Sequence, residues 1–125
     1  MNALRRLLVG LAGLYGAAGV ALSAAAAHMA VDASLATAAQ FLLFGALSLL
    51  GITAFAVAGG PGWSFAEVGG AMIALGTALF SGAIAMRILV GLVLFPMAAP
   101  TGGTLTIAGW LVVALAAFER RARPT

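Results

Sequence analysis

The chain has 125 residues, of which 64% are hydrophobic and 7% charged, and its formal net charge is +3. An ordinary soluble domain has about 45–50% apolar and about 25% charged residues, so this composition excludes a soluble globular protein. The absence of cysteine excludes disulfides, thiolate metal sites and a cysteine nucleophile. Because a membrane helix needs about 20 apolar residues, the length accommodates four spans with short connections and little else.

Four apolar segments follow one another along the chain, at about residues 7–27, 38–57, 68–87 and 104–118. Residues 58–62 separate the second segment from the third and are rich in glycine and proline, which predicts a tight hairpin. The sequence therefore predicts an all-α fold, an integral membrane bundle of four transmembrane helices with short loops. Residues 1–125 are expected to form a single transmembrane domain. A cleaved signal peptide is the alternative reading of the first segment, because small residues follow its apolar core.

The third segment raises a question of length. A helix from Phe65 to Phe95 would be about 46 Å long at 1.5 Å per residue, which exceeds the thickness of the hydrocarbon core. Either this helix tilts strongly or its end bends along the membrane interface. Gly91 and Pro96 favour the bend, because both residues interrupt helices.

Arginines near both ends of the chain predict its orientation. An excess of arginine marks the cytoplasmic side of a membrane protein, and four spans place both termini on that side. Arg87 is the exception, and we expect its side chain to extend to the outer interface. Glu67 lies in the first turn of the third helix, where it suits the helix dipole and where Arg5, Arg6 or Arg120 neutralises it. A buried proton carrier is the alternative role for Glu67. The residues that carry the orientation signal are Arg5, Arg6, Glu67, Arg120, Arg121 and Arg123.

Small residues are frequent in the predicted helices. Gly10, Gly13, Gly16 and Gly19 recur every three residues and wind half-way round the first helix. In lipid, small residues allow close backbone approach, so these glycines predict helix packing within one bundle or, alternatively, contact between copies of the chain. Trp110 lies well inside the fourth segment, where we expect it to pack in the bundle.

Polar residues gather near the predicted outer face. We expect His28, Asp32 and Arg87 there, with Gln40 not far below. They form either a polar vestibule for protons or a small anion, or an ordinary interfacial cluster with an Asp32–Arg87 ion pair. Thr37 and Gln40 have capping-box spacing, which predicts the start of the second helix, and Gln40 alternatively faces the bundle and binds a polar guest. One histidine and one acid are too few for a metal site.

Several blocks of the sequence together resemble the YgdD and YwdK type of small bacterial membrane proteins, a family without an assigned function. The blocks are residues 16–28, 37–41 with 46–47, 79–82, and 100–103 leading to 108–110. The resemblance implies four transmembrane helices and no particular activity. Gly45 stands where such proteins commonly have a histidine, so a mechanism that needs a histidine pair is in doubt. The motif positions that the resemblance indicates are His28, Gln40, Ser81, Gly82, Pro100, Gly102, Gly103 and Trp110.

We therefore expect a non-enzymatic accessory or oligomeric component of the bacterial inner membrane that works through helix contacts. Its expected partners are membrane lipids and a second copy of the chain or a larger complex. The alternative is a small oligomeric channel or transporter for protons or a small solute, with a polar path past His28, Gln40, Ser81 and Arg87. We expect no cofactor, and no nucleic acid, because the arginines are placed as topology signals beside apolar segments.

Overall fold

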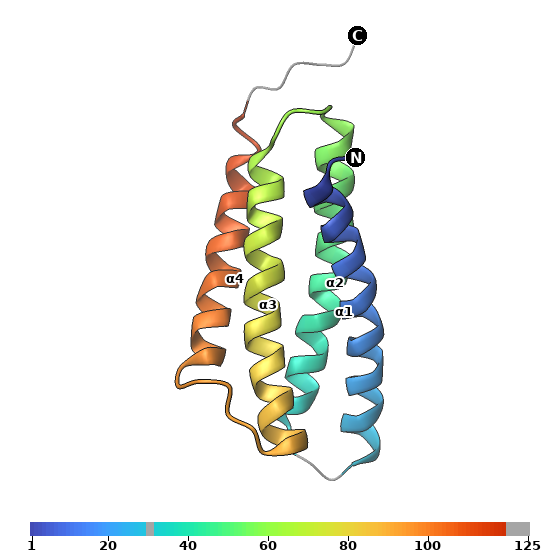
Figure 1. The fold of residues 1–125 in the computed structure, drawn as a ribbon, viewed down its shortest axis with the longest axis vertical. Helices are drawn as coiled ribbons and strands as arrows, with labels where there is room; N and C mark the ends of the chain where they lie inside the picture. The colour runs from blue at the N-terminus through green and yellow to red at the C-terminus, as the bar shows by residue number, and fades with distance from the viewer. Residues whose placement is uncertain (30–31, 120–125) are drawn as a thin grey trace.

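The structure is a computed structural model that describes residues 1–29 and 32–119. Within these residues the chain forms four helices, α1 (Ala3–His28), α2 (Ser34–Ala58), α3 (Phe65–Val90) and α4 (Ala98–Leu115), as Figure 1 shows. All four are long and apolar enough to cross a membrane. The predicted all-α membrane bundle of four helices is confirmed.

The first two helices begin earlier than the apolar segments indicate, because polar side chains bind the amides at their starts. The side chain of Asn2 accepts a hydrogen bond from the amide of Arg5 at 2.8 Å and starts α1. Asp32 accepts from the amide and the hydroxyl of Ser34, at 2.9 Å each, and α2 begins there. The predicted capping box is therefore wrong, since Thr37 and Gln40 already lie inside α2.

The third helix ends at Val90 and does not continue to Phe95. Gly91 adopts a left-handed conformation with φ 68°, and its N–H donates to the carbonyl of Met86. Residues 92–97 form an irregular connection, so the expected interruption lies at Gly91 but no bent helical end follows it. The fourth helix begins at Ala98, six residues before the predicted start. Its first turn contains Pro100, where the missing N–H costs nothing.

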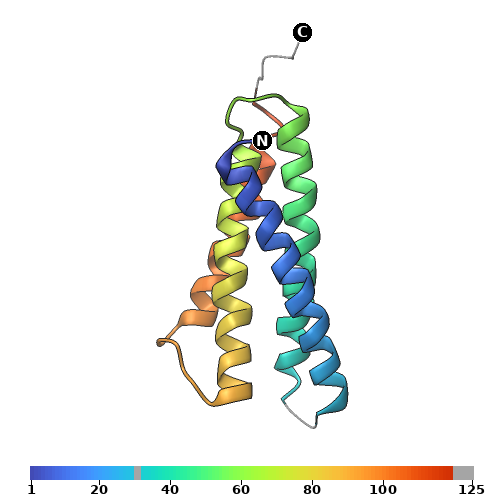
Figure 2. The ribbon, with the colours of Figure 1, turned by 45° about the vertical axis from the view of Figure 1, so that its right-hand side comes forward.

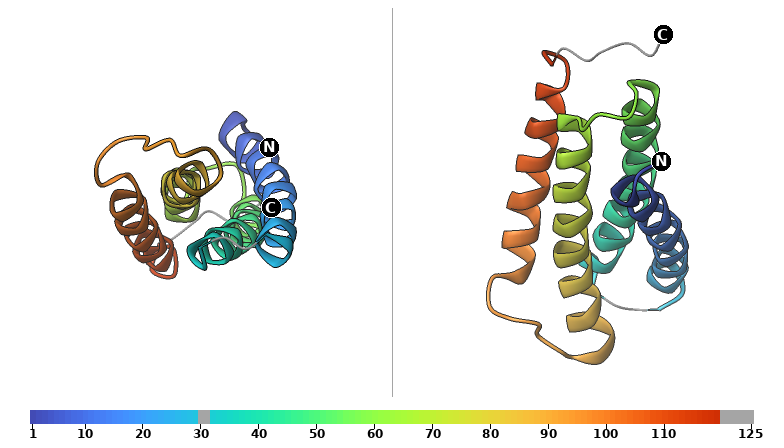
Figure 3. Two further views of the ribbon diagram at one scale, coloured as in Figure 1. Left: turned by 90° about the horizontal axis from the view of Figure 1, so that it is seen from below. Right: turned by 45° about the horizontal axis from the view of Figure 1, so that its top comes forward.

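The helices form two antiparallel hairpins, α1 with α2 and α3 with α4, joined mainly through contact between α2 and α3. Figure 3 shows the resulting arrangement from below, with α4 lying against α3. Among the described residues, α4 has no comparable contact with α1 or α2. α1 lies near α3 at the N-terminal end and diverges from it toward His28 (Figure 2). The bundle is therefore open on the side between α2 and α4.

The apolar core lies where the two hairpins meet, in the half of the bundle nearer the N-terminus. Its buried residues come from all four helices or their ends, and many other large apolar side chains are exposed on the outside of the bundle. Hydroxyl groups on α1 and α3 form hydrogen bonds across the two hairpins. The Tyr15 hydroxyl donates to the carbonyl of Ala74 at 2.6 Å, and the Ser81 hydroxyl donates to the carbonyl of Ala38 at 2.9 Å. The buried core residues are Leu8, Ala12, Leu49, Ile52, Ala66, Ile73, Ala74 and Ala116.

Candidate functional site

A buried ion pair joins α1 to α3 at the N-terminal end of the bundle. Arg5 donates from Nε and Nη2 to Oε1 of Glu67, at 3.0 and 2.7 Å, and the two side chains are 4% and 3% exposed. The same Nη2 donates to the carbonyls of Gly60 and Gly62, at 2.9 and 3.1 Å, and so holds the loop between α2 and α3. Arg5 is thus the arginine that neutralises Glu67. Arg6 is exposed.

A second polar contact joins the end of α4 to the start of α3. Ser64 caps α3 by accepting from the amide of Ala66 at 3.1 Å, and its hydroxyl donates to Oε1 of Glu119. The other carboxylate oxygen of Glu119 accepts from the amide of Phe65 at 2.9 Å. Sequence reasoning assigned no role to Ser64, although Ser64 and Glu67 have capping-box spacing. Together these bonds close the N-terminal end of the bundle around the start of α3. The predicted topology residues Arg120, Arg121 and Arg123 lie outside the described residues.

The opposite end of the bundle carries the predicted polar cluster of His28, Asp32, Gln40 and Arg87, and all four residues are exposed. No hydrogen bond or ion pair connects any two of them within residues 1–29 and 32–119. Asp32 instead binds Ser34, whose amide and hydroxyl hold the pKa of the Asp32 carboxyl below its usual range. The charge of Arg87 adds to this shift from a longer distance. The structure therefore does not form the expected Asp32–Arg87 ion pair.

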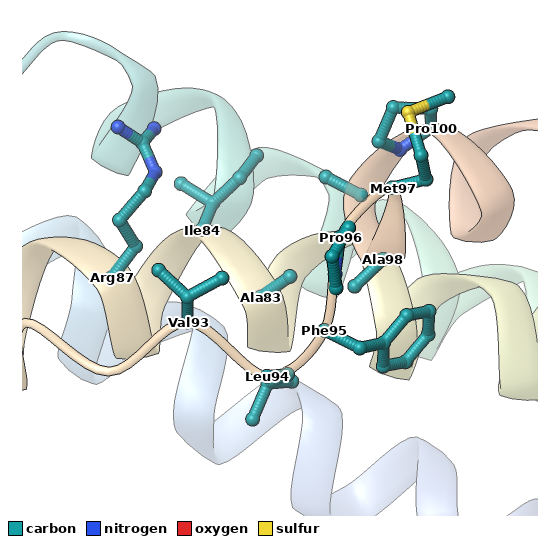
Figure 4. Close-up of a pocket in the computed structure, with 11 residues that line it drawn as sticks. Ala83, Ile84, Arg87, Val93, Leu94, Phe95, Pro96, Met97, Ala98 and Pro100 are labelled. Atoms are coloured by element: carbon teal, nitrogen blue, oxygen red, sulfur yellow. The ribbon is translucent and has the colours of Figure 1, made fainter.

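Arg87 borders a cavity of about 190 Å³ between α3 and the connection to α4. In Figure 4 its guanidinium points away from Leu94 and Phe95, which lie across the cavity. Ser81, which the sequence placed on the same polar path, is fully buried and bonded to the carbonyl of Ala38. His28 and Gln40 do not line this cavity. The four residues of the expected path thus do not line one cavity in the described chain.

Glycines form the seam between α3 and α4. A Cβ atom at Gly76 would lie 2.6 Å from the carbonyl oxygen of Gly102, and one at Gly69 would lie 2.6 Å from that of Gly109. Real side chains do not approach backbone so closely, and the two helices therefore touch through their main chains. The glycines recur every seven residues on each helix, which keeps them on one face. Of these four, sequence reasoning had singled out only Gly102.

The other predicted packing positions divide between the inside and the outside of the bundle. Gly16 and Gly19 face α2, with added Cβ atoms 3.7 Å from Ala46 and 2.8 Å from Leu43. A Cβ at Gly103 would lie 3.7 Å from the ring of Phe80. In contrast, Cβ atoms at Gly10, Gly13 and Gly82 would meet no atom within 4 Å.

The outward side of α1 is a continuous face of small residues. At 100° per residue its five members fall within an arc of about 80°, and all five are exposed. This small-residue face has two overlapping repeats in which small residues stand four apart, from position 13 to 17 and from 17 to 21. Its members are Gly10, Gly13, Ala17, Ala21 and Ala24.

A groove lies between α2 and α4, with α3 as its floor. It holds two adjoining cavities of about 250 and 210 Å³. Both cavities are lined by Phe41, Thr77, Thr106 and Trp110. Trp110 is 47% exposed, so it packs at the rim of the bundle and not in its interior. We call this surface the α2–α4 groove.

The described residues contain no group of three or more histidine, cysteine, aspartate or glutamate side chains that could hold a metal ion. A family model described as "Protein of unknown function (DUF423)" matches residues 12–103. No curated protein and no solved structure matches the chain.

Proposed function

The chain belongs to this DUF423 family of uncharacterised proteins, and we propose that it is a non-enzymatic membrane component that self-associates through the small-residue face of α1. We further propose that it is of the YgdD and YwdK type, which residues 16–28 and 37–41 resemble. Its partners are membrane lipids and further copies of itself or a larger membrane complex, and it binds no nucleic acid.

The observation that carries this proposal is the outward position of Gly13, Ala17 and Ala21. Lipid tails are as apolar as leucine, so no hydrophobic force draws helices together inside a membrane. Association instead depends on close packing, which small residues at spacings of four permit. Within the described chain no other element covers this face, since a Cβ at Gly10 or Gly13 meets open space. A second α1 helix fits against it.

The buried polar side chains support a structural role. Arg5, Glu67, Tyr15 and Ser81 each bind a group on another helix or loop, and so hold the helices together. Polar groups used in this way fix the arrangement of a bundle and are not available to a substrate.

Leucine substitutions on α1 test the proposal. Ala17→Leu places a branched side chain on the small-residue face. We expect it to raise the dimer dissociation constant at least about tenfold, which corresponds to about 1.4 kcal/mol of binding free energy. The constant can be measured by energy transfer between labelled copies in liposomes. Ala54→Leu is the matched control, because Ala54 is exposed on α2. A monomeric wild-type chain, or equal effects of the two substitutions, would contradict the proposal.

We also propose that the chain lies in the bacterial inner membrane with both termini in the cytoplasm, on the strength of the terminal arginines. Single cysteines at positions 32 and 62 test the orientation, because they occupy opposite ends of the bundle and the native chain has no cysteine. An impermeant thiol reagent added to intact cells should label Asp32→Cys and not Gly62→Cys. Labelling of Gly62→Cys and not of Asp32→Cys would contradict the proposed orientation and place both termini outside the cytoplasm.

A further inference from the structure

The hydroxyl of Thr77 lacks a hydrogen-bond partner in the middle of the membrane. Thr77 stands 12 residues from the start of α3, about 18 Å along the helix, and 13 residues from its end. Its side chain is 2% exposed and lines both cavities of the α2–α4 groove, but it makes no hydrogen bond with any described residue. The neighbouring hydroxyls of Thr106 and Ser48 are bonded to carbonyls of their own helices. Without water in the hydrocarbon core, the Thr77 hydroxyl needs a partner inside the groove.

Trp110 supplies a second unpaired donor in the same groove. It lies about 5 Å from the middle of α4 along the helix, well inside a hydrocarbon core that extends about 15 Å to each side of its centre. Tryptophans that anchor at the membrane interface lie further out, and an indole N–H at this depth faces hydrocarbon in place of water, so it needs a partner. In the described chain the Trp110 indole donates to no other residue, and its side chain lines both cavities.

The walls of the groove favour an apolar and uncharged guest. Phe41 and Phe80 meet edge to face with ring centroids 4.9 Å apart, and Phe44 lies beside Phe41. No charged side chain lines either cavity. Gly45 keeps the space beside the hydroxyl open, because a Cβ there would lie 3.3 Å from Oγ1 of Thr77. The guest must therefore be apolar over most of its surface and offer a hydrogen-bond acceptor.

We propose that the α2–α4 groove binds a membrane-dissolved quinone, with a ring carbonyl accepting hydrogen bonds from Thr77 and Trp110 and the ring packed among the phenylalanines. A phospholipid fits less well, because its ester carbonyls stay near the headgroups, about 15 Å from the level of Thr77. An acyl chain alone offers no acceptor. This site lies away from the small-residue face of α1, so the inference does not rest on self-association.

Fluorescence of Trp110 tests the site directly. The chain has two tryptophans, so the background variant Trp63→Phe leaves Trp110 as the single emitter. Titration of this variant in phosphatidylcholine nanodiscs with decylubiquinone should give saturable static quenching. Thr77→Val removes the hydroxyl and keeps the shape of the side chain, and we expect it to raise the dissociation constant about fivefold.

Thr53→Val is the matched control, because the Thr53 hydroxyl is equally buried and unpaired but does not line the groove. Its dissociation constant should equal that of the background variant. Quenching that stays linear with quinone concentration, or equal values for the two valine variants, would overturn the proposal. A disulfide between two copies of Ile107→Cys that forms without quinone and prevents quenching would show that a second chain fills the groove. Ala17→Leu should bind quinone normally even where self-association is lost.

Discussion

Gly76→Ala tests whether the backbones of α3 and α4 really touch. The added methyl would lie 2.6 Å from the carbonyl oxygen of Gly102 and 2.7 Å from the amide nitrogen of Thr106. Both atoms belong to the main chain and cannot rotate away. Since favourable contacts begin near 3.5 Å, the helices must separate locally by about 1 Å. Overpacking of this kind costs about 1–3 kcal/mol, from which the higher helix propensity of alanine subtracts up to about 1 kcal/mol.

Gly82→Ala is the matched control in the same helix. A Cβ at Gly82 meets nothing within 4 Å, so alanine there should leave stability unchanged or raise it by up to about 1 kcal/mol. The free energy of unfolding can be measured for both variants by titrating mixed micelles with sodium dodecyl sulfate. We expect Gly76→Ala to be the less stable variant by about 1–3 kcal/mol. Equal stability of the two variants would refute the close approach of the helices.

Two further predictions concern the charged residues at the ends of the bundle. Arg5→Met leaves the buried Glu67 carboxylate without its charged partner and should cost about 3–5 kcal/mol in the same unfolding assay, whereas Arg5→Met with Glu67→Leu should recover most of this loss. A double variant as unstable as the single one would contradict this account. Ser34 lowers the pKa of Asp32, so the hydrogen bonds between these two residues stabilise the fold in a pH-dependent way. The stabilisation is complete at pH values above the ordinary carboxyl pKa of about 4, and it is lost as the pH falls through the lower pKa of the folded state. Asp32→Asn should weaken the pH dependence of the thermal midpoint between pH 2 and 5 relative to the native chain. An unchanged pH profile would contradict a stabilising role of the Asp32–Ser34 hydrogen bonds.

The number of helices was predictable because each is an apolar run long enough to span the hydrocarbon core. Their starts were less predictable, because a few polar side chains determine them. Asn2 and Asp32 add turns that no apolar pattern requires. The partner of Glu67 was predictable only as one of three arginines, since the choice of Arg5 depends on where α1 meets α3.

The glycines show why the candidate sites were harder to predict. A spacing of three winds round a helix, so Gly16 and Gly19 face α2 while Gly10 and Gly13 face outward. Whether a given glycine faces a neighbouring helix is a property of the assembled bundle. The α2–α4 groove could not be predicted at all, because it exists only where α4 packs on α3 and leaves α2 uncovered. The unpaired hydroxyl of Thr77 becomes visible only in that arrangement.

Cross-linking in native membranes measures self-association through α1 most directly. The chain has no cysteine, so Ala17→Cys places a single thiol at the centre of the small-residue face. Leu47→Cys is the control, because Leu47 is 70% exposed and also lies near the middle of its helix. Mild oxidation of membranes should convert Ala17→Cys to a disulfide-linked dimer and leave Leu47→Cys monomeric. A monomeric Ala17→Cys, or equal dimer yields at both positions, would contradict association through this face.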